Sequence, residues 1–191
     1  MFKFPKDLII FDVETSGTNP ETSSIIQIGA VIFDKNGKLF DKYYFNEYVK
    51  LYTNEWSEEA YNIHKIDKTF LENYGKDLET VLKLFEVWAS PVWDDLKKRY
   101  WLAQWGSGFD TNMLREAYKK VNREYPFHYR SFDIASIVRF ELARSGKLFQ
   151  KCGEEKCAKA LGIEVFDTQL HDALYDAQLS GLMLEKITKG E

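Results

Sequence analysis

Two acidic residues interrupt an apolar segment near the start of the chain. The segment reads L-I-I-F-D-V-E-T-S-G over residues 8–17, and its apolar half is typical of a buried strand. Side chains two positions apart on a strand point to the same face, so Asp12 and Glu14 project together while Val13 points into the core. Adjacent carboxylates repel each other, and a hard divalent cation such as Mg²⁺ or Mn²⁺ relieves that repulsion. The segment therefore predicts a metal site on a central strand.

The D-x-E spacing alone is weak support for a site. A chain of 191 residues with 30 acidic ones contains about one such pair by chance. A second pair, Asp77 and Glu79, stands at the predicted start of a helix, where negative charge is favoured by the helix dipole. We interpret that second pair as structural, and the apolar setting of Asp12 as the feature that favours function.

Length and composition predict one globular domain over residues 1–191. The chain is 45% hydrophobic, yet no apolar run approaches the roughly 18 residues of a membrane span. The first residues lack a signal-peptide layout and only two cysteines are present, so a cytoplasmic protein with no membrane contact is expected. Cys152 and Cys157 have no nearby histidine to complete a zinc set and are interpreted as free, buried or half-buried thiols.

The formal net charge of −4 argues against a broad basic surface for long duplex DNA. This net charge is compatible with a protein that binds only the end of a nucleic-acid strand. Two bound divalent cations would bring the formal charge to about zero and remove much of the repulsion towards a phosphate backbone.

Strands are predicted first and helices later. Strands cover residues 7–14, 25–34 and 37–46, and an Asn-Gly turn at 34–37 joins the last two into a hairpin. The remaining predicted elements are a short helix from Ser57, a helix over 78–88 that ends before Pro91, a strand over Arg99 to Trp105, and helices over 111–122, 133–144, 154–161 and 173–188. This order predicts an α/β fold: a mixed central sheet of about five strands, the first three antiparallel, with helices on both faces.

A third acid, Asp110, follows the strand over residues 99–105 and precedes a helix. It could be an N-cap. Alternatively it lies at the edge of the sheet, close to Asp12 and Glu14.

A histidine and an aspartate precede and open the last predicted helix. His171 and Asp176 are five residues apart, which on an ideal helix separates their side chains by about 140°. Both can serve one site only if His171 lies ahead of the helix and Asp176 within it, with Asp172 as the cap. Histidine suits a general base because imidazole titrates near neutral pH.

The chain contains two other histidines, His64 and His128. His128 and Asp133 have the same spacing, but His128 stands in a predicted loop and Asp133 looks like a helix cap. His64, taken alone, is typical of a surface or helix-end position.

Taken in order, Asp12, Glu14, Asp110, His171 and Asp176 resemble the catalytic set of the DEDDh exonucleases, the DnaQ-like branch of the ribonuclease-H-like superfamily. The motifs are F-D-x-E-T-S-G, then F-D before a helix, then H-x₄-D-A, and they span nearly the whole chain. A sister group carries tyrosine in a Y-x₃-D motif. Here that position is Asp172, so the histidine type fits.

The resemblance implies a ribonuclease-H-like fold and a 3′–5′ exonuclease that uses two divalent cations, Mg²⁺ or Mn²⁺. Its substrate would be the 3′ end of single-stranded DNA or RNA, and its products nucleoside 5′-monophosphates. By this resemblance Asp12 bridges both ions and Glu14 and Asp176 bind the ion that holds the attacking water. Asp110 supports the second ion through water, and His171 takes the proton of the attacking water.

The resemblance also implies contacts with the terminal nucleotide at Thr15, Gly17, Ile63 and His64. The family's I-H-G-I segment looks like residues 63–66 here, with Lys65 in place of glycine. Trp105 and Gly106 stand where many DNA proofreaders have His-Asn, and this resembles members that trim RNA. RNA is therefore slightly favoured over DNA.

Two other functions remain as alternatives. One is a catalytically inactive module on the same fold that binds nucleic-acid ends or docks a protein partner, whose identity the sequence leaves open. The other is a globular protein whose acids are only helix caps. The presence of all five residues favours the enzyme.

Overall fold

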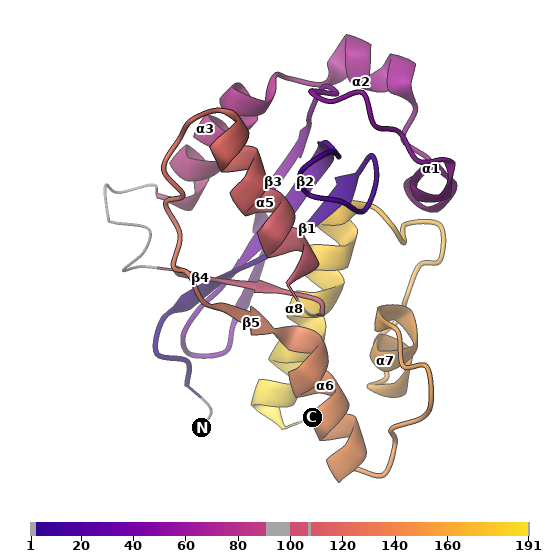
Figure 1. The fold of residues 1–191 in the computed structure, drawn as a ribbon. Coiled ribbons are helices and arrows are strands. Elements are labelled where there is room, and N and C mark those ends of the chain that lie inside the picture. The colour runs from indigo at the N-terminus through magenta and orange to yellow at the C-terminus, as the bar shows by residue number, and fades with distance from the viewer. Residues whose placement is uncertain (1–2, 91–99, 107, 191) are drawn as a thin grey trace.

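A computed structural model describes residues 3–90, 100–106 and 108–190 of the chain (Figure 1). Its strands form one sheet in the order β3-β2-β1-β4-β5. The central strand is β1 (Asp7–Thr15), which is antiparallel to β2 (Ile25–Phe33) and parallel to β4 (Tyr100–Gln104). At the edges, β3 (Leu39–Tyr48) is antiparallel to β2 and β5 (Ser131–Asp133) is parallel to β4. The predicted mixed sheet, with its first three strands antiparallel, is confirmed.

Helices cover both faces of this sheet, as predicted (Figure 1). One face packs against α3 (Leu78–Ala89) and α5 (Phe109–Lys120). The other packs against α6 (Ile134–Arg144), α7 (Glu154–Ala160) and α8 (Ala173–Lys189). Two short helices, α1 (Glu58–His64) and α2 (Lys68–Tyr74), precede α3. No helix in the described part of the chain is long and apolar enough to cross a membrane.

Successive side chains of β1 enter two different hydrophobic cores. Phe11 and Val13 belong to the core beneath α3 and α5. Ile10 belongs to the core beneath α6, α7 and α8. Because strand side chains alternate, Asp12 and Glu14 continue the row of Ile10 and lie on the face that α8 covers. The predicted division, with the two acids on one face and Val13 on the other, is confirmed.

The elements differ from the sequence predictions in several places. The hairpin turn is as predicted, with Gly37 at φ 92°, but β3 runs over 39–48 and α5 begins at Phe109. Neither β5 nor α2 was predicted as an element of its own. β5 has only three residues, and α2 buries only Leu71, so neither carries a periodic pattern. Pro91 and Arg99, predicted to bound a helix and a strand, lie outside the described residues.

The prediction of two free thiols is wrong for this structure. Cys152 and Cys157 form a disulfide, with their Cα atoms 5.7 Å apart. Both residues are buried in the core beneath α7 and α8. The first turn of α7 brings Cys157 back towards the preceding loop, a proximity that the sequence separation does not reveal.

A glycine in β2 lets the last helix approach the sheet. Gly29 is paired with Asp12 across the two strands. A Cβ atom on Gly29 would lie 2.1 Å from the backbone nitrogen of Leu174 and 2.2 Å from the carbonyl carbon of Ala173. The first turn of α8 therefore rests directly on β2, which places Asp176 near Asp12.

We expect Gly29→Ala to push the first turn of α8 away from the sheet. Overpacking of this kind costs about 1–3 kcal/mol of unfolding free energy, measurable by urea unfolding. Gly181→Ala within α8 is the comparison, because its added methyl group meets the side chains of Leu39 and Ile10 and no backbone atom among its three nearest neighbours, and because alanine has the higher helix propensity. Equal losses in the two variants would contradict the proposed close contact at Gly29.

Candidate active site

Three carboxylates from β1 and α8 converge at one point. Asp12, Glu14 and Asp176 each offer an oxygen atom that lies within 4.8 Å of the other two. Glu14 and Asp176 are both only 8% exposed. Within residues 3–90, 100–106 and 108–190, no lysine or arginine forms an ion pair with these acids. Carboxylate oxygens without cationic partners are the ligands that a hard divalent cation prefers, so the three residues could hold a metal ion.

Burial and mutual repulsion raise the pKa values of these acids. Burial is the largest cause for Glu14, and with the charges of Asp176 and Asp110 it raises the pKa to about 8. Burial likewise raises the pKa of Asp176 to about 7. The pKa of Asp12 is raised well above its ordinary value by burial and then by the charges of Asp110 and Glu14. Without a cation, the site therefore holds protons at a pH where carboxyl groups are normally ionised.

We expect the metal-free chain to lose stability as pH rises from about 4.5 to about 8. The raised pKa values of Glu14 and Asp176 mean that the folded chain binds more protons than the unfolded chain in this range, so the free energy of unfolding falls with increasing pH. Urea unfolding in EDTA at pH 5, 6.5 and 8 should show a loss of about 2 kcal/mol or more. Glu14→Gln should reduce the slope, and stability that rises across this range would contradict the electrostatics of the site.

Asp110 lies inside α5 and contacts β1. It is 4% exposed, and its Oδ1 accepts a hydrogen bond from the backbone nitrogen of Val13 at 3.3 Å. The N-cap of α5 is Gly108, with φ 96°, so the alternative reading of Asp110 as the cap is wrong. Gln104, at the end of β4, accepts a hydrogen bond from the backbone nitrogen of Thr111 at 2.9 Å and positions this turn. Asp110 lies close enough for its charge to raise the pKa of Asp12 and Glu14, and burial raises its own pKa to about 7.

His171 and Asp176 have the arrangement that their spacing predicted. His171 lies ahead of α8 in the left-handed region, with φ 65°. Its backbone nitrogen donates to Oδ2 of Asp176 at 3.1 Å. Asp172 caps the helix by accepting hydrogen bonds from Leu174 and Tyr175. Oδ1 of Asp176 is buried and has no hydrogen-bond partner in the described part of the chain, which leaves it free for a ligand.

The second histidine pair has a structural role. His128 stacks against Trp101, with ring centroids 5.2 Å apart, and its Nδ1 accepts a hydrogen bond from the backbone of Arg130. Asp133 caps α6 through the backbone nitrogen of Ser136. The interpretation of Asp133 as a cap is confirmed.

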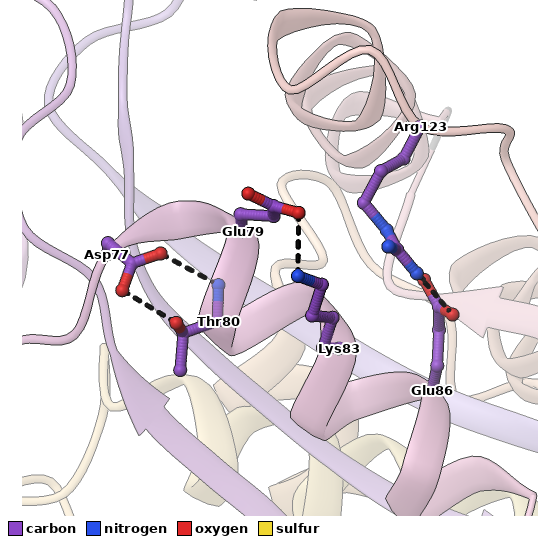
Figure 2. Close-up of polar contacts among 6 residues, drawn as sticks. All are labelled: Asp77, Glu79, Thr80, Lys83, Glu86 and Arg123. Atoms are coloured by element: carbon purple, nitrogen blue, oxygen red, sulfur yellow. Dashed lines mark hydrogen bonds and ion pairs between the residues drawn. The ribbon is translucent and has the colours of Figure 1, made fainter.

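The second D-x-E pair is also structural, as Figure 2 shows. Asp77 caps α3 by accepting hydrogen bonds from the backbone and hydroxyl of Thr80. Glu79 forms an exposed ion pair with Lys83 at 2.7 Å. This pair is far less buried than Asp12 and Glu14, which explains why identical spacing has a different meaning.

The predicted nucleotide contacts lie around the end of β1 and in α1. The hydroxyl of Thr15 donates to the carbonyl oxygen of Gly17 at 2.7 Å. Gly17 itself is covered, because an added Cβ would lie 2.5 Å from Oε1 of Glu55. The backbone nitrogen of Ser57, the N-cap of α1, donates to the carbonyl of Ser16 at 2.7 Å. This hydrogen bond holds the start of α1 beside the first motif.

The end of α1 presents one exposed and one buried side chain. Ile63 is 53% exposed and His64 is 8% exposed. Lys65, which replaces the family's glycine, ends the helix in the left-handed region with φ 57°. Burial, followed by the charges of Lys65 and His171, lowers the pKa of His64 to about 4. The effect of the His171 charge on the pKa of His64 indicates that the end of α1 lies near the segment that precedes α8.

Sequence reasoning missed two residues that build this site, Gln27 and Glu154. Gln27 is fully buried opposite Glu14 in β2. Its Nε2 donates to Oδ2 of Asp172 at 2.9 Å, and its Oε1 accepts from the backbone of Ala173. The sequence feature that could have identified Gln27 is a single amide side chain within an otherwise apolar strand. Glu154 lies on α7 near the acids, and no sequence signal distinguished it from an ordinary helix-start acid.

Comparison with known proteins gives consistent matches over the length of the chain. A family model described as Exonuclease matches residues 9–183. Ribonuclease T of Buchnera aphidicola subsp. Baizongia pistaciae is 24% identical over 94% of this chain and 82% of its own length. The PolC-type DNA polymerase III of Oceanobacillus iheyensis is 27% identical over 95% of this chain, which spans only 11% of the polymerase.

Solved structures share the fold at low sequence identity. The crystal structure of cell-death related nuclease 4 superposes with a TM-score of 0.80 and 18% identity, over 97% of this chain and 64% of that one. The nuclease domain of 3′hExo, a DEDDh family member bound to rAMP, superposes with a TM-score of 0.73 and 19% identity. The superposition covers 97% of this chain and 92% of that domain. The chain therefore belongs to the exonuclease family, as a DEDDh-type 3′–5′ exonuclease with a ribonuclease-H-like fold.

Proposed function

We propose that this chain hydrolyses phosphodiester bonds at the 3′ end of single-stranded nucleic acid, with RNA slightly favoured over DNA, and releases nucleoside 5′-monophosphates. The observation that carries this proposal is the convergence of Asp12, Glu14 and Asp176 within 4.8 Å. His171 supports it, because its backbone is hydrogen-bonded to Asp176 and its side chain is exposed beside the acids.

The acids are proposed to hold two divalent cations, Mg²⁺ or Mn²⁺. Asp12 would be shared by both ions, Glu14 and Asp176 would bind one of them, and Asp110 would act on the other through water. The buried, unpartnered Oδ1 of Asp176 supports this assignment, as does the position of Asp110 outside the group of three. When bound, such ions activate a water molecule and stabilise negative charge on the phosphate and the leaving 3′ oxygen.

His171 is proposed as the general base. Its place ahead of α8 leaves the imidazole exposed beside the acids, while the hydrogen bond from its backbone fixes its distance from Asp176. An imidazole in this position can take the proton of the attacking water and pass it to solvent.

Thr15, Gly17, Ile63 and His64 are proposed to bind the terminal nucleotide. Ile63 offers an exposed apolar surface on α1, and the hydrogen bond between Ser57 and Ser16 holds α1 beside the acids. Because Gly17 is covered by Glu55, we assign its contact to the backbone. The slight preference for RNA is supported by the similarity to Ribonuclease T. This chain spans 82% of the length of that relative.

A competition between matched strands tests the substrate. RNA and DNA of one sequence, each labelled at the 3′ end, are incubated together with the chain and Mg²⁺. We expect both to lose their label and RNA to lose it a few-fold faster. Faster loss from DNA would overturn the preference for RNA, and binding of both strands without release of label would support the inactive module instead.

A further inference from the structure

Glu154, on α7, is a fifth acid near the site, in addition to Asp12, Glu14, Asp176 and Asp110. Glu154 is the first residue of that helix, and its Oε1 accepts a hydrogen bond from the hydroxyl of Ser180 at 2.6 Å. Ser180 is 2% exposed and lies in α8, four residues after Asp176. Residues four apart occupy the same face of a helix. The hydrogen bond therefore holds Glu154 one turn of α8 away from Asp176.

Glu154 borders the same cavity as the proposed catalytic pair. A hollow of about 320 Å³ is lined by Glu154, His171 and Asp176, together with Glu155, Lys156, Leu170 and residues of the loop before α7. The carboxylate of Glu154 thus borders the same hollow as His171 and Asp176.

Glu154 interacts electrostatically with Asp12, Asp110 and Asp176, although it is not one of the convergent three. Burial raises its pKa to about 8, the hydroxyl of Ser180 opposes this, and Asp176 and Asp110 raise it further. Glu154 in turn raises the pKa of Asp12. Its oxygens are outside the group that meets within 4.8 Å.

Glu154 differs from an ordinary acid at the start of a helix in its lack of a cationic partner among the described residues, and Asp176, which lines the same hollow, has a buried oxygen without a partner there. Glu155, its neighbour, forms an ion pair with Lys159 at 2.7 Å, whereas Glu154 has no such pair in the described part of the chain. In addition, Oδ1 of Asp176 is buried and unpartnered, so Glu154 does not satisfy it directly. Both acids line the same hollow, and a hydrated cation bound there would be stabilised by both carboxylates.

We infer that Glu154 is a fifth carboxylate of the metal centre, which acts through water on the ions and is oriented by Ser180. This inference rests on the proposed function. Carboxylates outside the ligand set accept hydrogen bonds from metal-bound histidines or metal-bound water, and their loss typically lowers metal affinity about 10–100-fold. Glu154 is accordingly a positioning residue that raises cation affinity.

Titration of the full chain with Mn²⁺, with free Mn²⁺ measured by electron paramagnetic resonance, tests this inference without any activity assay. Glu154→Gln keeps the size of the side chain and its contact with Ser180 but removes the charge. We expect its Mn²⁺ affinity to fall about 10-fold and its melting temperature in EDTA to rise, because repulsion among the buried acids is relieved. Glu155→Gln is the matched control and should bind Mn²⁺ like the wild type.

Asp12→Asn, titrated in parallel, distinguishes the inference from the function on which it rests. If Asp12→Asn weakens Mn²⁺ binding while folded Glu154→Gln binds normally, Glu154 is only a buried partner of Ser180 and the inference is overturned alone. If Asp12→Asn binds normally, the proposed metal centre fails as well. Should Glu154→Gln not fold, Ser180→Ala keeps the charge and loses the orientation. Weaker binding by that variant would support the inference, and unchanged binding would overturn it.

Discussion

Replacing Asp12 by alanine should lower the rate of mononucleotide release at least about 1,000-fold. Asp12 is the proposed shared ligand of both cations, so its loss would remove water activation and charge stabilisation together. The folded chain should tolerate the change, because burial and neighbouring acids already raise the pKa of Asp12 well above its ordinary value. The measurement is the single-turnover rate with Mg²⁺, together with a melting curve in EDTA.

Asp77→Ala is the matched control for this experiment. Asp77 belongs to the same D-x-E pattern but caps α3 through Thr80. Its loss should cost about 1 kcal/mol of stability and leave the rate unchanged. If Asp12→Ala retains wild-type activity, or if Asp77→Ala matches its loss, the assignment of the first motif is wrong.

Replacing His171 by alanine should lower the rate about 100-fold or more and remove its rise with pH near neutrality. A general base must lose its proton before it can accept one from water, so activity normally increases as the imidazole deprotonates. The variant should keep its fold, because His171 uses its backbone nitrogen, and not its side chain, to hold Asp176. The measurement is the rate from pH 5.5 to 8.5 at saturating Mg²⁺.

His128→Ala serves as the control for the pH profile. His128 stacks on Trp101 and Tyr129 in the loop before β5, so its loss should affect stability only. A wild-type pH profile in His171→Ala, or a flattened one in His128→Ala, would remove His171 from the role of general base.

The features that the sequence predicted correctly are those encoded by local periodicity. Alternation in β1 placed Asp12 and Glu14 on one face and Val13 on the other, and the structure has this arrangement. The spacing of His171 and Asp176 required a break between them, and the Asp172 cap supplies it. These predictions succeeded because the side-chain directions of strands and helices follow from backbone geometry alone.

The features that the sequence did not predict depend on contacts between distant segments. β5 is a strand only because it pairs with β4, and Glu154 lies near Asp176 because α7 packs against α8. In the sequence Gln27 is an isolated polar residue in an apolar strand. Its hydrogen-bond partners, Asp172 and Ala173, are distant in the sequence and adjacent only in the fold. The prediction of Asp110 as a possible N-cap was wrong because Gly108 holds that position and Asp110 is the second residue of the helix.

The central claim is that the acids around Asp12 remove nucleotides one at a time from a 3′ end with the help of divalent cations. It is tested most directly by following a 5′-labelled single strand with Mg²⁺ and with EDTA. The account predicts a ladder of labelled strands that shortens stepwise from the 3′ end, with nucleoside 5′-monophosphates released, and no reaction in EDTA. Internal cleavage, early loss of the 5′ label, or an undiminished rate in EDTA would contradict it.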